Sequence, residues 1–203
     1  MIFDLITIFL VGVILMFAGF TALQFLGKFP HRQITDVVPY LRRTELEELE
    51  SLLDPVQEKT LRFQLSPLEF RHWQRKRVHL MYEYLLRMSH NALVLIEWGN
   101  MESGHDQAPP ASKKAQERQA LAQEMVRAAT ELRLYSLLAL MKLKLWIILR
   151  MDSWPLISAG SIPTLRQVFG IDALATYARV REMAGGLGES YGLEYQQQLT
   201  GRI

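Results

Sequence analysis

The side chains best suited to chemistry in this sequence are histidines and glutamates that recur between residues 67 and 98. Both residue types bind metals, and both serve as general acids and bases. At 3.6 residues per turn, the members of this set fall within roughly 20° of one line along a helix. The set consists of His72, His79, Glu83, His90 and Glu97. A metal site or acid–base pair on this line, with His79, Glu83 and His90 as candidates, is therefore one hypothesis.

The same helical wheel places an apolar set on the opposite side. These apolar residues recur at steps of three and four and centre about 180° from the histidine and glutamate line. The polar line therefore lies on the face away from the core, where water is the usual neighbour. The Glu-x-x-His spacing of di-iron helical bundles is also missing. We expect no bound metal and no other cofactor, and a polar face that contacts water or a partner.

Other catalytic motifs are missing from the sequence. It contains no nucleophile elbow, phosphate-binding loop, dinucleotide fingerprint or zinc-protease motif. The glycines of residues 185–188 follow a predicted helix instead of preceding one, which argues against a phosphate cradle. With no cysteine and a net charge of +2, the composition implies neither a disulfide framework nor binding to nucleic acid. The sequence therefore predicts no catalytic residue.

The N-terminal segment carries the strongest signal for location. Residues 5–26 include no charged side chain. Roughly 20 apolar residues at ~1.5 Å each cross hydrocarbon about 30 Å thick, so residues 1–27 are predicted to form a transmembrane anchor. A cleaved signal peptide is the alternative. It is disfavoured because Asp4 replaces a basic start, the apolar run is too long, and Phe20 stands where cleavage needs a small residue.

Basic residues lie only on the C-terminal side of this segment. The positive-inside rule keeps such a flank in the cytoplasm. We therefore expect a single-pass protein of the cell membrane, with its N-terminus outside and residues 28–203 in the cytoplasm. The predicted membrane flank consists of Lys28, Arg32, Arg42 and Arg43.

The rest of the chain is predicted to be all-α. Capping signals at Thr44, Asp54 and Ser66 begin helices, and no strand-like alternation is present. We expect helices near residues 44–53, 55–64, 67–98, 112–150 and 163–184, with loops at 102–110 and 152–161. The predicted regions are the anchor 1–27, a juxtamembrane linker with short helices 28–66, a helical hairpin or bundle domain 67–184, and a flexible tail 185–203.

The two long helices are predicted to pair as an antiparallel hairpin. Apolar residues recur on both at coiled-coil spacing for about three heptads, and one short loop joins the helices. A core hairpin is the simplest interpretation, and a seam for an identical partner chain is the alternative. The predicted seam consists of Val78, Met81, Leu85, Met88, Ala92 and Leu95 on the first helix, and of Leu121, Met125, Ala128, Leu132 and Tyr135 on the second.

The basic run at residues 71–79 has several interpretations. Its cations point in different directions on a helix, so they do not form a stripe that follows a phosphate backbone. Solvation or pairing with the acidic block at residues 45–58 is favoured, and contact with anionic headgroups is the main alternative.

The end of the second long helix loses its polar face. Burial in the bundle is the favoured explanation, and contact with the membrane surface or a membrane protein is the alternative. Lys142 and Lys144 argue against a second transmembrane span. The apolar positions are Leu134, Leu137, Met141, Leu145 and Ile148.

These observations favour a membrane-anchored helical protein that works by protein–protein contact, as an accessory or scaffold subunit. The expected partners are the bilayer and either another membrane protein or a second copy of the chain, whereas nucleic acid is not expected. The alternative function is that of a membrane-tethered enzyme that uses the polar line of residues 67–98.

The predicted topology can be tested with a reporter fused after Ile203. The reporter should be active in the cytoplasm and inactive outside it, because the basic flank at Lys28 and Arg32 holds residues 28–203 inside. Activity only on the outer side would show that the orientation is reversed.

Overall fold

The computed structural model describes residues 37–45, 47–48, 51, 54–104, 112–151 and 173–203. The chain divides into two compact units, residues 1–33 and 34–203, and all described residues belong to the second. The predicted anchor at residues 1–27, with Lys28 and Arg32 beside it, lies outside the described residues. Among the helices that are described, none combines the length and the apolar character needed to cross a membrane.

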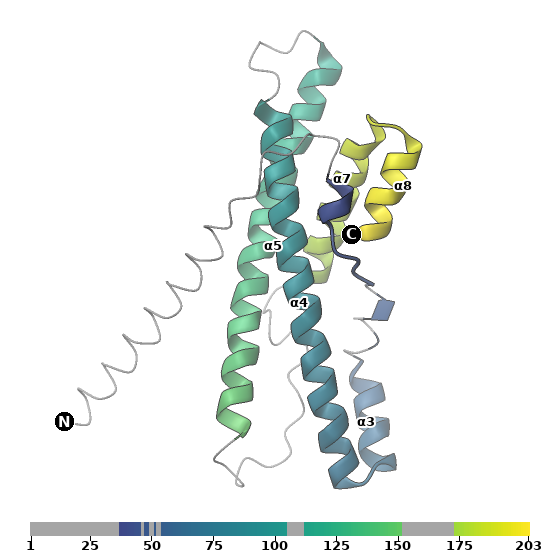
Figure 1. Ribbon diagram of the computed structural model, residues 1–203, viewed down its shortest axis with the longest axis vertical. Coiled ribbons are helices and arrows are strands. Elements are labelled where there is room, and N and C mark those ends of the chain that lie inside the picture. Colours follow the sequence, from purple (N-terminus) through teal and green to yellow (C-terminus); the bar gives the residue numbers. More distant parts are fainter. Residues whose placement is uncertain (1–36, 46, 49–50, 52–53, 105–111, 152–172) are drawn as a thin grey trace, which may run out of the picture. The chain divides into compact units, whose positions relative to one another are not determined.

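The described residues form helices and no strands (Figure 1). This confirms the all-α prediction. The elements are a 3-10 helix η1 (Val38–Tyr40) and the α-helices α3 (Pro55–Gln64), α4 (Pro67–Gly104), α5 (Lys113–Met151), α7 (Ala173–Glu189) and α8 (Leu193–Arg202).

Helices α3 and α4 begin where their capping residues predict. The Asp54 carboxylate accepts a hydrogen bond from the Val56 backbone at 2.8 Å, and Pro55 occupies the first turn. Ser66 and Glu69 form a reciprocal capping box, with hydrogen bonds of 3.0 and 3.4 Å. The hydrogen bond from Ser66 lowers the pKa of the Glu69 carboxyl. The Ser66–Glu69 capping box lies at the turn between α3 and α4 and begins the second helix there.

Helices α4 and α5 lie side by side and form the predicted long hairpin (Figure 1). Most residues of the predicted seam are buried, and Leu121 and Tyr135 are half-buried. Helix α4 continues beyond the predicted end at residue 98 to Gly104. The added residues include Glu102, which is buried, as is Trp98 at the predicted end. Tertiary packing therefore outweighs the low helix propensity of Gly99.

Gly99 allows the two helices of the hairpin to approach closely. A Cβ atom at this position would lie 2.5 Å from Cγ2 of Val126 and 3.1 Å from the backbone oxygen of Ala122. Such distances leave no room for a methyl group. Gly99 is thus required by the packing of α4 on α5.

The C-terminal region differs from the flexible tail predicted for residues 185–203. Helix α7 continues through Gly185 and Gly186 to Glu189, and a turn at Gly192, with φ of 107°, leads into α8. Leu187, Leu199 and Ile203 are buried. The glycines were expected to end the helix, but Gly188 instead lets α8 approach, since a Cβ there would lie 3.0 Å from Leu199 Cδ2.

The apolar side of α5 is only partly covered. Leu137 is buried as expected, whereas Leu134 and Met141 are 55% and 38% exposed. The favoured prediction of burial in the bundle is therefore wrong for these two residues. Helix α7 packs on α5, where Arg179 pairs with Glu124 and Gly186 lies close to Leu121, and neither of these contacts involves Leu134.

The close approach at Gly99 predicts the effect of a single methyl group. Gly99→Ala should lower the free energy of unfolding by about 1–3 kcal/mol, because the added Cβ overpacks the hairpin. Gly104→Ala is the matched control, since a Cβ there meets nothing within 4 Å. Thermal unfolding of the full chain in mild detergent, followed by circular dichroism, measures both. Equal melting temperatures for the two variants would contradict the close approach.

Candidate functional site

The predicted histidine and glutamate line is not a single site in the structure. His72 and His79 are exposed on α4. Glu83 lies 3.3 Å from His79 and 3.7 Å from Arg87, on the same helix. Within the described part of the chain, no three histidine, aspartate or glutamate side chains lie close enough together to hold a metal ion.

His90 was expected on a face open to water, and the structure corrects this. The side chain is half-buried, and its Nε2 lies 3.0 Å from the backbone oxygen of Tyr40. Glu97, at the end of the same line, is half-buried and interacts electrostatically with Arg133 of α5. Burial lowers the pKa of Arg133, and Glu97 opposes this shift. The helical wheel gave the direction of both side chains from α4, but it could not show what packs against that face.

Asn91 is the centre of the contact that covers this face. Its side chain is fully buried, and its amide pairs with both backbone groups of Arg42: Oδ1 accepts from the nitrogen at 2.8 Å, and Nδ2 donates to the oxygen at 2.7 Å. The Nδ2 group also lies 3.3 Å from Thr44 Oγ1 and 3.2 Å from the Tyr177 hydroxyl. One amide thus holds an extended segment against α4.

The segment held by Asn91 also buries apolar side chains. Val37 and Leu41 are 1% and 2% exposed, and they belong to the same core as the hairpin seam. Tyr177 of α7 donates a hydrogen bond to the Ile203 backbone oxygen at 2.8 Å, and burial raises the pKa of this tyrosine. Asn91 therefore links residues 37–44 to α4, α7 and the end of α8. Arg42 and Arg43, predicted as membrane flank, remain exposed.

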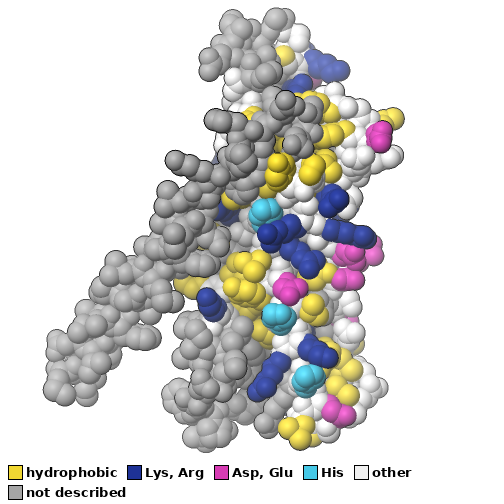
Figure 2. Space-filling view, viewed as in Figure 1, with side chains coloured by type: hydrophobic (Ala, Val, Ile, Leu, Met, Phe, Trp, Pro, Cys, Tyr) yellow, Lys and Arg dark blue, Asp and Glu magenta, His cyan; other side chains and the backbone are white. Residues whose placement is uncertain are grey.

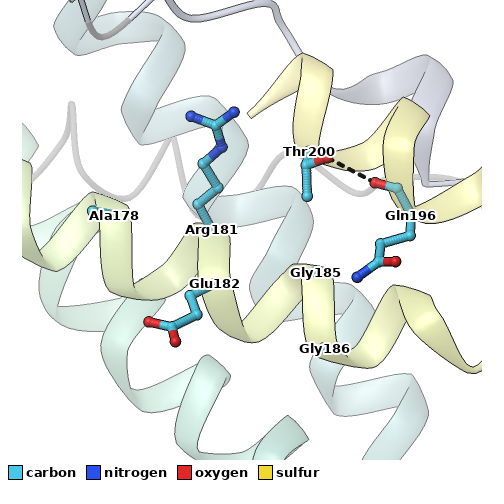
Figure 3. Close-up of a pocket in the computed structure, with 7 residues that line it drawn as sticks. All are labelled: Ala178, Arg181, Glu182, Gly185, Gly186, Gln196 and Thr200. Carbon is cyan, nitrogen blue, oxygen red and sulfur yellow. Dashed lines mark hydrogen bonds between the residues drawn. The ribbon is translucent and has the colours of Figure 1, made fainter. Parts of the chain in front are cut away.

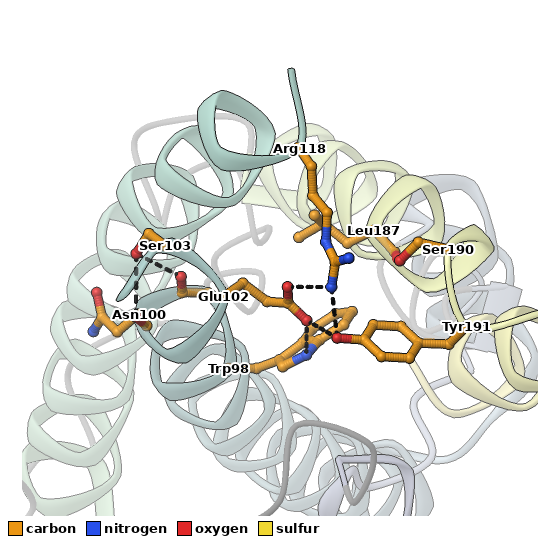
Figure 4. A network of polar contacts seen from close by, with 9 residues as sticks. Trp98, Asn100, Glu102, Ser103, Arg118, Leu187, Ser190 and Tyr191 are labelled. Atoms are coloured by element: carbon orange, nitrogen blue, oxygen red, sulfur yellow. Dashed lines mark hydrogen bonds and ion pairs between the residues drawn. The ribbon is translucent and has the colours of Figure 1, made fainter. Parts of the chain in front are cut away.

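A second polar cluster lies where α4 ends and α5 begins (Figure 4). The side chain of Glu102 is 2% exposed, and its Oε1 accepts hydrogen bonds from Trp98 Nε1 at 3.1 Å and from the Tyr191 hydroxyl. Its Oε2 accepts a hydrogen bond from Arg118 Nη2 at 2.5 Å, and the same nitrogen donates to the Tyr191 hydroxyl oxygen at 2.6 Å. Burial and then the bond to Glu102 raise the pKa of Tyr191 above its usual range.

This cluster connects segments that are far apart in the sequence. Trp98 and Glu102 come from α4, Arg118 from α5, and Tyr191 from the turn between α7 and α8. The described donors satisfy both carboxylate oxygens of Glu102. The role of this carboxylate is therefore structural: it holds the three segments together. The sequence placed Glu102 in a loop, and for that reason the cluster was not anticipated.

Further polar pairs join α3 and the preceding segment to α4. Arg77 Nη1 donates a hydrogen bond to Glu58 Oε2 at 2.6 Å, and both side chains are buried. The guanidinium carbon of Arg77 also lies 5.2 Å from the centroid of the Trp73 ring. The Tyr84 hydroxyl donates to Glu48. Burial, followed by this hydrogen bond, raises the pKa of Tyr84 to about 12. Acidic side chains of residues 45–58 are thus engaged in intramolecular contacts, as favoured above.

A shallow groove lies between α7 and α8 (Figure 3). It has a volume of about 440 Å³, and Gly185 and Gly186 form part of its floor. The side chains of Arg181 and Glu182 extend in different directions from α7, so they do not converge on a ligand. The groove thus offers space without a set of converging polar groups.

Comparison with known proteins found no matching family model, no similar curated protein and no similar solved structure. Any functional conclusion therefore rests on the chain itself.

The bidentate contact of Asn91 predicts what holds residues 37–44 in place. Asn91→Ala should release this segment and lower stability, because each buried polar group left without a partner costs about 1–3 kcal/mol. Release should also speed tryptic cleavage after Arg42 and Arg43. Asn100→Ala, at an exposed position on the same helix, is the control. Unchanged cleavage and stability in Asn91→Ala would show that apolar packing alone holds the segment.

Proposed function

We propose that this chain is a single-pass, membrane-anchored helical protein that acts through protein–protein contact, as an accessory or scaffold subunit. The uncharged segment at residues 5–26 supports the anchor, and the basic flank after it supports a cytoplasmic location for residues 28–203. The described residues supply the observation that supports contact with another protein.

That observation is the exposed apolar strip on α5, which we define as Leu134, Leu138 and Met141. Leu134 and Met141 are exposed and Leu138 is half-buried. Their spacing of four and three residues places them on one side of α5, opposite the seam residue Leu132. An apolar strip at this spacing fits the apolar face of another helix. An anchored chain meets other membrane proteins at raised effective concentration, which favours such a protein as the partner.

The alternative, a membrane-tethered enzyme, has weaker support. Only His79 and Glu83 of the candidate set form a direct pair, and both side chains are solvent-accessible. His90 is engaged with the Tyr40 backbone. The polar line therefore lacks a third group that converges on the pair.

A photocrosslinking residue at Leu134, in the full chain and in native membranes, tests the proposed contact. It should form an adduct with another polypeptide, whereas the same residue at Gln123, exposed on α5, should not. Met141→Asp, which places a charge in the strip, should abolish the adduct. An adduct of twice the chain mass identifies a second copy as the partner. Efficient incorporation at Leu134 without any adduct would contradict the proposal.

A further inference from the structure

The turn between α3 and α4 displays the two most exposed large apolar side chains of the described residues. Phe63, in the last turn of α3, is 83% exposed, and Leu68, in the first turn of α4, is 78% exposed. The Ser66–Glu69 capping box makes this turn sharp, so both side chains lie at one end of the described domain, at the lower end in Figure 1. We call this end, residues 63–68, the apolar tip.

Basic side chains lie behind the apolar tip and have no acidic partner in the part of the chain that the structure describes. Among the described residues, none of them forms an ion pair, and all are exposed. The nearby acidic groups are used elsewhere: Glu58 pairs with Arg77, Glu69 caps α4, and Asp54 caps α3. The cations are Lys59 and Arg62 on α3, and Arg75 and Lys76 on α4.

Helix geometry places these cations at a limited distance from the tip. At ~1.5 Å per residue, Lys59 lies roughly 6 Å behind Phe63, and Arg75 and Lys76 lie roughly 10–12 Å behind Leu68. A headgroup layer is about 5–8 Å thick, and the long side chains of Lys and Arg extend their charges several Å further. In Figure 2, hydrophobic side chains and one acidic side chain lie at the lower end of the visible face, with Lys, Arg and His side chains above them.

We propose that the apolar tip and the cations behind it form a membrane-binding site for an anionic lipid surface. Phe63 and Leu68 enter the boundary of the acyl chains, and Lys59, Arg62, Arg75 and Lys76 contact anionic headgroups. The cations project from different sides of two helices and lie roughly 2–12 Å behind the tip along the helix axes. This arrangement fits a planar partner better than a phosphate backbone or a single acidic protein face. The site requires no residue of the predicted anchor.

The absence of cysteine allows a direct measurement on the full chain. A spin label at Leu68→Cys reports whether the tip enters lipid, because oxygen concentrates in the bilayer and a nickel chelate stays in water. The full chain is mixed with vesicles of neutral phosphatidylcholine or of phosphatidylcholine with phosphatidylglycerol. Flotation of these vesicles measures, independently of the spin label, whether the chain is attached to them. Gln116→Cys, exposed at the other end of the hairpin, carries the control label.

The label at position 68 should become accessible to oxygen and protected from nickel in anionic vesicles, whereas the label at position 116 should stay in water. The double variant Arg75→Gln, Lys76→Gln should reduce the ratio of lipid-embedded to aqueous label about 25-fold. The reason is that each cation near an anionic surface contributes about fivefold to binding. Lys114→Gln with Arg127→Gln removes the same charge from exposed positions on α5 and should leave the ratio unchanged.

The outcomes separate this site from the proposed anchor. Flotation with neutral vesicles supports the anchor, whatever the label at position 68 reports. Flotation only with anionic vesicles, with the label embedded, supports the tip and contradicts the anchor. If the chain floats but the label at position 68 stays in water with anionic lipid, the proposal is overturned, and an acidic protein becomes the better partner for the tip.

Discussion

The packing of α4 against α5 is the contact on which the rest of the described structure depends. The seam buries Met81, Leu85, Met88 and Leu95 against residues such as Met125 and Leu132. Each such side chain contributes about 1.5–3 kcal/mol when it is fully buried. Small residues at Gly99, Ala92, Ala122 and Ala128 keep the two backbones close. Helix α7 packs on α5, and the segment that contains η1 packs on α4, so both additions use surfaces that the hairpin creates.

Buried polar groups then decide how the additional segments attach to this hairpin. Asn91 pairs with the backbone of Arg42, and Glu102 joins Trp98, Arg118 and Tyr191. Apolar contacts alone are tolerant of small shifts, whereas a buried amide or carboxylate is stable only when its hydrogen-bond partners are in place. These clusters therefore give the described domain a specific arrangement, and their polar atoms are occupied within the chain.

Two exposed apolar surfaces support the proposal that the chain acts by contact. The apolar strip on α5 and the apolar tip between α3 and α4 expose Leu134, Met141, Phe63 and Leu68 to water, at a cost that a binding partner would remove. The strip has helical spacing, which supports the proposal of a helical partner, whereas the tip has cations behind it that pair with no described residue, which supports the proposal of an anionic membrane. In the two proposals, the strip contacts a partner protein and the tip contacts a bilayer.

The sequence by itself determined the helical class, the helix starts at Asp54 and Ser66, and the residues of the seam, because caps and apolar periodicity are local properties. The surroundings of His90, the roles of Asn91 and Glu102, and the packing of residues 185–203 were decided only by tertiary structure. His90 and Asn91 contact residues some 50 positions earlier in the chain, and Tyr191 meets Glu102 across 89 positions. Gly185 and Gly188 carry a strong local signal for a helix end, but the close approach of α8 and the burial of Leu187 and Leu199 outweigh it. A helical wheel gives the direction of a side chain, and only the folded chain determines what lies in that direction.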